Sequence, residues 1–272
     1  MFGRTKKQAI EDDAEVESTE VDEAIEDEDD EDAVDEAVEA TDEATPGEPA
    51  AEEFDDDADE VDAEPLDPWV ALDRSQDWRY DGPFDIDEVD LDADDVQRLD
   101  FGTLIITPFD GMKLQLQVNP ANNQVQAVLV MHGQSALEVA VFAAPARSSM
   151  LAEVRADMAE ATEKAGGEMS LAEGPFGTEV RRTLPVTTPD GKQGQAITRT
   201  WFAEGPKWLL RGVLMGQAAL RDGEAGAGAL LYEFFCNAVV RRGDEPHVPG
   251  QLIPMTVPNS LLAGQSPDGA TS

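Results

Sequence analysis

Three aspartates spaced two residues apart, Asp90, Asp92 and Asp94, match the first three ligand positions of a calcium-binding loop. The sixth position of such a loop needs glycine for its turn, and the twelfth needs a glutamate that binds the ion through both oxygens. This chain has Asp95 and Phe101 at those two positions. The pattern therefore argues against a calcium site. We expect only weak association of cations with this acidic segment.

Zinc binding and nucleophilic catalysis find no better support. The two histidines, His132 and His247, and the single cysteine, Cys236, are far apart in the sequence and show no ligand spacing. Cys236 lies in an apolar helical segment without a histidine or lysine within one turn, so we expect it to be packing material. Neither a Gly-x-Ser-x-Gly elbow nor a glycine-rich phosphate loop occurs. The sequence predicts no catalytic residue, no cofactor and no metal ligand.

A site assembled from distant residues is a separate hypothesis. Trp201, Trp208 and Arg211 belong to two neighbouring predicted strands and would line a ligand pocket on a sheet face. Such a pocket would make the protein an enzyme or a small-ligand-binding domain, which is the alternative to an interaction module.

Two arginine doublets, Arg181-Arg182 and Arg241-Arg242, are the only basic doublets of the predicted domain. Neighbouring residues of a strand point to opposite faces, so a doublet on a strand offers one charge to each side. Surface solubility explains these arginines. The more specific hypothesis is a contact with the chain's own acidic tail or with a partner.

The acidity of the chain is concentrated near its N-terminus. Residues 11–64 hold 30 acidic side chains and no basic one, within a net charge of -40 for all 272 residues. Such a segment buries too little apolar surface to offset the entropy of ordering, so we predict a disordered acidic tail. Because nucleic acids reward clustered lysine and arginine, direct nucleic-acid binding is not expected. An unknown protein partner selected by the acidic arm would be basic.

Composition also sets the predicted boundaries. They are a disordered acidic tail (1–64), a transition segment that docks on the domain (65–97), a single domain (98–258) and a frayed C-terminus (259–272). No run of about 18 apolar residues occurs, so no membrane insertion is expected. The N-terminal residues lack the apolar stretch of a secretory signal, and a single cysteine fits a reducing cytoplasm.

Hydrophobic periodicity predicts an α+β domain, with a mainly antiparallel sheet and two principal helices. The predicted strands cover 100–107, 112–118, 125–131, 137–143, 178–186, 195–203 and 208–215. One helix is expected over 149–165, and the other carries an apolar stripe at Leu230, Leu231, Phe234, Phe235 and Ala238. The strand 208–215 is apolar on both faces, which is typical of a central strand. The order of elements is loosely similar to Mog1/PsbP-like sandwiches.

Short motifs spread over the chain carry a resemblance to a known family. They are Met1-Phe2-Gly3-Arg4 with Lys6-Lys7, Gly82-Pro83-Phe84-Asp85, Leu99-Asp100-Phe101-Gly102, Gly174-Pro175-Phe176-Gly177, Trp208-Leu209-Leu210-Arg211-Gly212, and the close at Pro254 to Pro258. Together with the acidic tail, they resemble an actinobacterial family whose domain has no known function, over about residues 78–258. The resemblance implies a soluble cytoplasmic protein and supplies no reaction or catalytic residue.

The absence of clustered catalytic side chains and the presence of the acidic arm lead to one principal hypothesis. The sequence favours a non-enzymatic protein-interaction or regulatory module whose disordered acidic arm contacts a partner or the domain itself.

Overall fold

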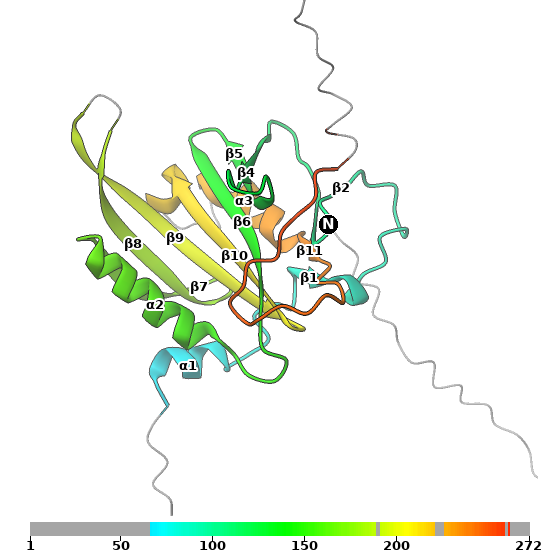
Figure 1. Cartoon of the computed structure of the whole chain (residues 1–272), viewed down its shortest axis with the longest axis horizontal. Coiled ribbons are helices and arrows are strands. Elements are labelled where there is room, and N and C mark those ends of the chain that lie inside the picture. The colour runs from blue at the N-terminus through cyan, green and yellow to red at the C-terminus, as the bar shows by residue number, and fades with distance from the viewer. Residues whose placement is uncertain (1–65, 189–190, 221–225, 259–260, 262–272) are drawn as a thin grey trace, which may run out of the picture. The chain divides into compact units, whose positions relative to one another are not determined.

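A computed structural model describes residues 66–188, 191–220, 226–258 and 261. The predicted acidic tail and nearly all of the predicted C-terminal fray lie outside these residues. Seven antiparallel strands form the main sheet in the order β4-β5-β6-β10-β9-β8-β7 (Figure 1). Their bounds are β4 Lys113–Val118, β5 Val125–His132, β6 Ser135–Ala143, β7 Glu168–Gly174, β8 Gly177–Thr187, β9 Gln193–Gly205 and β10 Trp208–Gly216. The predicted α+β class with a mainly antiparallel sheet is confirmed.

A second, smaller sheet joins the two ends of the described chain. Its order is β1-β11-β3-β2, with β1 Phe84–Asp85, β2 Leu99–Asp100, β3 Leu104–Ile106 and β11 Val239–Val240. β1 pairs in parallel with β11, so Phe84 lies opposite Val239. The segment that precedes the predicted domain is therefore part of a sheet with the last strand among the described residues.

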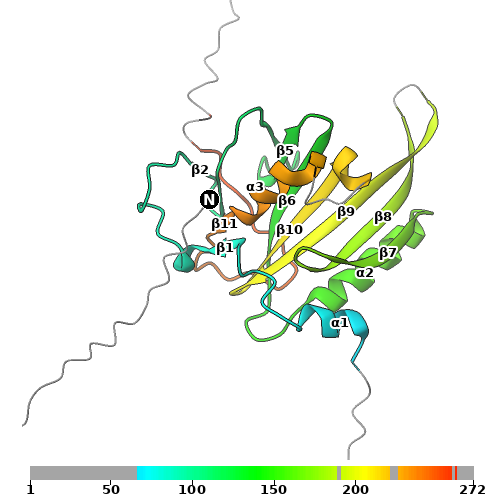
Figure 2. The same ribbon diagram turned by 180° about the vertical axis from the view of Figure 1, so that it is seen from behind.

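The two faces of the main sheet are covered by different helices. The helices are α1 Pro68–Asp73, α2 Leu151–Lys164 and α3 Ala229–Cys236, with short 3-10 turns at Ile86–Glu88, Gln217–Leu220 and Gly226–Gly228. α2 packs its apolar side chains against Phe202 and Leu209 on one face. α3 packs Phe235 against Trp201 on the opposite face, which Figure 2 shows from behind. The strand 208–215, predicted to be central, is covered on both sides as β10.

Close packing at the centre of the sheet explains one glycine of β10. A Cβ at Gly212 would lie 2.7 Å from Cε2 of Phe235 and 3.2 Å from Cδ1 of Leu137. Neither distance leaves room for a methyl group. Glycine at this position therefore allows the sheet and α3 to approach each other closely.

Several predicted details are wrong. The strand expected over 100–107 is interrupted by a turn between β2 and β3, and β7 and α1 lie in segments for which no strand or helix was predicted. The β9–β10 turn consists of Pro206 and Lys207, because Trp208 pairs with Gly205 and Lys207 adopts a φ of 62°. Leu230 is exposed on α3, whereas the other four predicted residues of the stripe are buried. Ala238 lies just after the end of the helix.

Candidate interaction site

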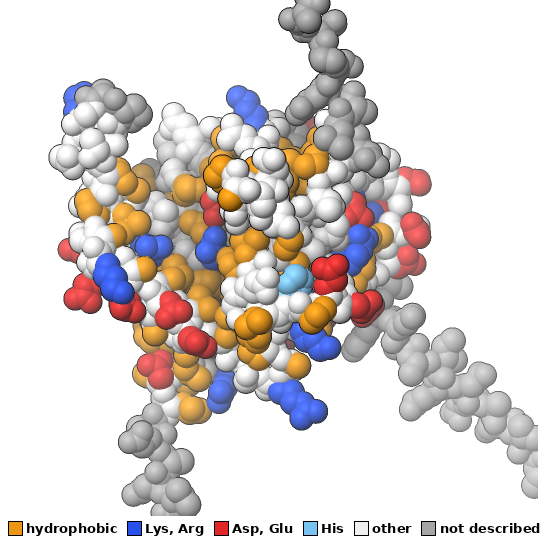
Figure 3. Space-filling view, viewed as in Figure 1, with side chains coloured by type: hydrophobic (Ala, Val, Ile, Leu, Met, Phe, Trp, Pro, Cys, Tyr) orange, Lys and Arg blue, Asp and Glu red, His pale blue; other side chains and the backbone are white. Residues whose placement is uncertain are grey.

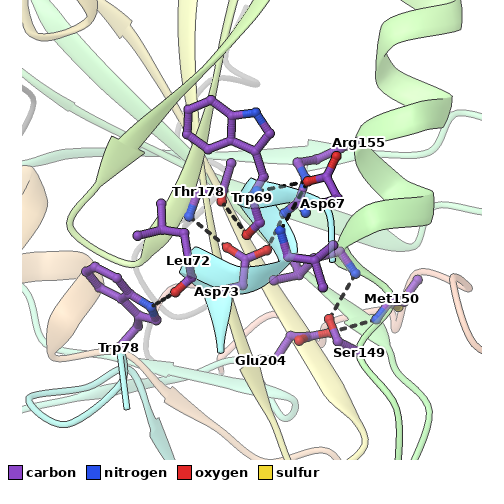
Figure 4. A network of polar contacts seen from close by, with 12 residues as sticks. Asp67, Trp69, Leu72, Asp73, Trp78, Ser149, Met150, Arg155, Thr178 and Glu204 are labelled. Atoms are coloured by element: carbon purple, nitrogen blue, oxygen red, sulfur yellow. Dashed lines mark hydrogen bonds and ion pairs between the residues drawn. The ribbon is translucent and has the colours of Figure 1, made fainter. Parts of the chain in front are cut away.

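The segment 66–83, which we call the anchored segment, is held on the end of the main sheet by a buried carboxylate. Asp73 Oδ2 accepts a hydrogen bond from Arg155 Nη1 at 2.6 Å, and its Oδ1 accepts one from the backbone N–H of Thr178 at 2.9 Å (Figure 4). The Thr178 hydroxyl donates to the carbonyl of Trp69 at 3.2 Å. One side chain of α1 thus bonds both α2 and β8, which fixes the position of the residues that follow α1.

Arg79 provides a second anchor. Its Nε donates to the carbonyl of Glu204 at 3.0 Å, and its two terminal nitrogens donate to the carboxylate of Glu88 at 2.6 and 2.8 Å. The guanidinium also lies 5.2 Å from the centroid of the Trp208 ring, within cation–π range. The indole N–H of Trp208 donates to Asp85 Oδ2 at 2.6 Å. Contacts of Asp73, Arg79 and Asp85 therefore bind this part of the chain to the main sheet before, within and after residues 76–82.

A cavity of about 480 Å³ lies where this segment meets the β7–β8 turn and α3. It is lined by Gln76, Asp77, Trp78, Tyr80, Asp81, Gly82, Pro175, Phe176, Tyr232 and Cys236, which we call the aromatic pocket. A pocket of this volume is within the range of small-ligand and side-chain sites. A smaller cavity of about 210 Å³ shares Asp77, Trp78 and Phe176 with it.

Contacts within the chain position the aromatic side chains of the pocket. The indole N–H of Trp78 donates to the carbonyl of Leu72 at 3.0 Å, as Figure 4 shows. The ring centroids of Phe176 and Tyr232 are 5.7 Å apart. Tyr80 also lines the pocket, and 63% of its surface is exposed. Exposed aromatic side chains beside a preformed pocket are typical of contact sites.

The charges of the pocket all have one sign. Two carboxylates, Asp77 and Asp81, line it, and no lysine or arginine does among the described residues. The pKa of the Cys236 thiol is raised to about 11, first because the thiol is buried and also because Asp81 and Glu233 lie near it. The pocket therefore disfavours negative charge and favours positive charge.

The three residues of the predicted ligand pocket are not brought together. Trp201 and Trp208 lie on the face of the sheet that α3 covers, where both are almost fully buried in the core. Arg211 points to the other face, because it pairs with Phe202. A core filled by the two indoles leaves no pocket at that place, and the strand alternation separates Arg211 from them.

The four arginines of the two doublets are engaged in local contacts. Nε of Arg181 donates to Glu179 Oε1 at 2.8 Å, and Nε of Arg182 donates to the hydroxyl of Thr162 at 2.8 Å. Nη1 of Arg241 donates to both carboxylate oxygens of Asp100 at 3.0 and 2.8 Å. Arg242 donates to the backbone carbonyls of Gly243 and Glu245. Their contact with the acidic tail stays a prediction, since residues 1–65 lie outside the described part.

Sequence reasoning missed a buried carboxylate beside Trp201. Glu179, 1% exposed, accepts hydrogen bonds from Arg199 Nε at 2.7 Å, from Arg181 Nε at 2.8 Å and from the indole N–H of Trp201 at 2.9 Å. Alternation on β8 and β9 places these side chains on one face, so the pairing was visible once the register was known. A carboxylate with both oxygens bonded to donors of the same chain is built for structure.

Other candidate chemistry is limited in the described part of the chain. No group of three or more histidine, cysteine, aspartate or glutamate side chains there is placed to hold a metal ion. Asp94, from the calcium-like run, instead forms a two-oxygen ion pair with Arg98 at 2.8 and 2.9 Å. None of the helices in this part has the length and hydrophobicity needed to cross a membrane.

The comparisons with known proteins report one family and a distant structural likeness. The solution structure of cyanobacterial PsbP (CyanoP) from Synechocystis sp. PCC 6803 is similar at 10% sequence identity and a TM-score of 0.32. The match covers 53% of this chain and 92% of that chain, and it concerns the fold alone. No curated protein matches the sequence.

The sequence profile of one family matches residues 82–263, which is most of the chain and contains the predicted domain. Its match begins inside the anchored segment and includes the pocket residues Phe176, Tyr232 and Cys236. The chain therefore belongs to the family described as proteins of unknown function, DUF3710.

Proposed function

We propose that the protein is a cytoplasmic, non-enzymatic interaction module that captures a basic segment of a partner protein in the aromatic pocket. The observation that carries the proposal is the composition of the pocket, where Trp78, Tyr80 and Tyr232 stand beside Asp77 and Asp81. An arginine or lysine side chain of the partner would lie against the rings and close to the carboxylates. A cation over an aromatic face contributes about 0.5–2 kcal/mol, depending on how far it is desolvated.

The charge of the rest of the chain supports the same partner. Residues 11–64 carry 30 acidic side chains and no basic one, and they precede the anchored segment directly. A block of like charge raises the encounter rate of an oppositely charged partner, and this effect weakens as salt is added. The acidic arm would thus attract a basic partner, and the aromatic pocket would hold one of its side chains.

The alternative of catalysis in this pocket has less support than binding. The thiol of Cys236 is the candidate nucleophile of the pocket. Burial raises its pKa, whereas an activated thiol needs a lowered pKa. Binding of a small cationic ligand remains the second candidate, because the pocket volume suits one.

The test measures the affinity of the full chain for an arginine-rich peptide by isothermal titration calorimetry. Tyr80→Ala and Asp81→Asn should each weaken binding several-fold, since each removes one kind of contact with the cation. The matched controls are Leu220→Ala, which removes an equally exposed apolar side chain, and Asp157→Asn, which removes an exposed carboxylate on α2. Equal effects of the site variants and their controls would reject the pocket.

A further inference from the structure

The face of the main sheet that α2 covers is only half occupied. α2 packs over the side of β7, β8 and β9, with contacts to Val180 and Phe202. On the other side, five apolar residues of β5, β6 and β10 stay partly exposed: Leu129, Met131, Ala136, Val213 and Met215. On the face turned to the viewer in Figure 3, hydrophobic and basic side chains lie next to each other. This surface is remote in the fold from the aromatic pocket, which involves α3 and the opposite face.

The strand register places one row of side chains across this face. Lys113 pairs with Met131, Met131 with Ala136, and Ala136 with Met215. Met215 then pairs with Thr198, and Thr198 with Arg182. We call these six residues the basic-ended row. It has a cation at each end, Lys113 on β4 and Arg182 on β8, and between them lie three apolar side chains and Thr198.

The neighbouring residues of β10 and β6 add a third cation that is incompletely paired. Arg211 lies 4.9 Å above the ring of Phe142 and donates through Nη2 to Glu138 at 3.2 Å. Its Nε is buried without a hydrogen-bond partner among the described residues. Glu138 is shared, because its other oxygen accepts from Nε2 of Gln117 at 2.7 Å. Glu138 therefore divides its two carboxylate oxygens between Arg211 and Gln117.

Electrostatics on the surface favours an added anion. Burial lowers the pKa of the Arg211 guanidinium, Glu138 opposes this effect, and repulsion from Arg182 adds to it. A carboxylate placed between Arg182 and Arg211 would relieve that repulsion and supply an acceptor for the unpaired donor. Hydrogen bonds between a guanidinium and a carboxylate are about twice as strong as neutral ones.

We infer that the basic-ended row is a docking surface for an acidic segment of a partner protein, one with apolar side chains between its carboxylates. Charge complementarity carries the inference, together with the apolar residues in the middle of the row. Five strand spacings of about 4.8 Å separate β4 from β8 along the sheet order, or roughly 24 Å. An extended segment of about seven residues is long enough to span that distance. Its terminal carboxylates would pair with Lys113 and Arg182.

The experiment titrates the full chain with a labelled peptide, Glu-Glu-Leu-Val-Leu-Glu-Glu, and follows fluorescence anisotropy at low and high salt. Lys113→Glu and Arg182→Gln should each weaken binding at least about tenfold, and Met215→Gln should weaken it several-fold. Lys113 is exposed at the edge of the sheet, so its replacement should leave the fold intact. The control Arg147→Glu changes an exposed arginine outside the row and should alter the affinity less than about twofold.

Two outcomes would overturn the inference. One is an equal loss of affinity in Arg147→Glu and Lys113→Glu, which would mean attraction without a site. The other is no binding to the full chain and none after residues 11–64 are exchanged for a neutral linker of equal length. Binding that appears only after this exchange would support the surface, with the chain's own acidic arm as a competitor of the partner for it. The result is independent of the aromatic pocket, whose residues none of these variants changes.

Discussion

The carboxylate of Asp73 in α1 and the guanidinium of Arg155 in α2 form an ion pair with an Oδ2 to Nη1 distance of 2.6 Å. Their side chains are only 10% and 6% exposed. Both charges are therefore largely withdrawn from water, and each depends on the other for compensation. This single contact joins the segment before the predicted domain to the helix that covers the sheet.

Replacing Asp73 by asparagine should destabilise the fold strongly, because the charge of Arg155 would stay buried without a partner. Breaking a buried pair from one side typically costs about 3–5 kcal/mol. The exposed pair of Glu160 and Lys164, with side chains 64% and 72% exposed, is the control, and Glu160→Gln should change stability by less than about 1 kcal/mol. Urea unfolding measures both. Similar losses in the two variants would contradict the burial argument.

Glu179→Gln should also destabilise the protein by about 3–5 kcal/mol, since Arg199 would lose its buried counter-charge. A second measurement is specific to this carboxylate. The NMR signal of the Trp201 indole N–H should move to lower frequency, because a hydrogen bond to a neutral amide is weaker than one to a carboxylate. Glu168→Gln, at an exposed position of β7, should change neither quantity. An unmoved indole signal in Glu179→Gln would show that the contact is absent.

Gly212→Ala should lower the melting temperature, because the added methyl group would press on Phe235 and Leu137. Overpacking of a filled core costs about 1–3 kcal/mol. Gly194 is the matched control on the neighbouring strand β9, where the nearest atom to an added Cβ is 3.7 Å away. Gly194→Ala should therefore be close to neutral. A larger loss in Gly194→Ala would mean that backbone preference, and not packing, decides.

Alkylation of Cys236 should be slow at neutral pH and rise toward pH 11. The pKa of its thiol is raised from 9.0 to about 11, chiefly by burial, so the reactive thiolate forms late. Between these two values the unfolded chain releases the proton while the folded one keeps it, so stability should fall as the pH rises through that window. Iodoacetamide labelling followed by mass spectrometry measures how the alkylation rate of Cys236 depends on pH. Half-maximal reactivity near pH 9 would contradict it.

Local patterns were sufficient for most of the main sheet. The alternation of apolar and polar residues predicted the strand at Met112 to Val118, and apolar residues on both faces identified the central strand β10. The strand β7 was not predicted because only two large apolar residues, Met169 and Leu171, alternate with polar or small ones over its seven residues. The helix α1 has only six residues, so its identity depends on the cap at Asp67 and on tertiary contacts more than on periodicity.

The candidate site was harder to predict than the fold. Trp78 and Tyr80 stand out in the sequence as aromatic residues in an acidic stretch, but Tyr232 lies far along the chain and reaches them only through the packing of α3. Strand geometry alone excludes a pocket on one sheet face that contains both Trp208 and Arg211. Residues three apart on a strand point to opposite faces, so one of the two had to face away from the other.

The pairing of β1 with β11 bears on how the protein is made. Phe84 lies next to Val239, so the first strand of the small sheet has no neighbour until β11 has left the ribosome. The main sheet, whose consecutive strands lie side by side from β4 to β6, can form earlier during synthesis. The anchored segment would then close over a finished sheet, and the aromatic pocket would come into existence only after α3 has been made.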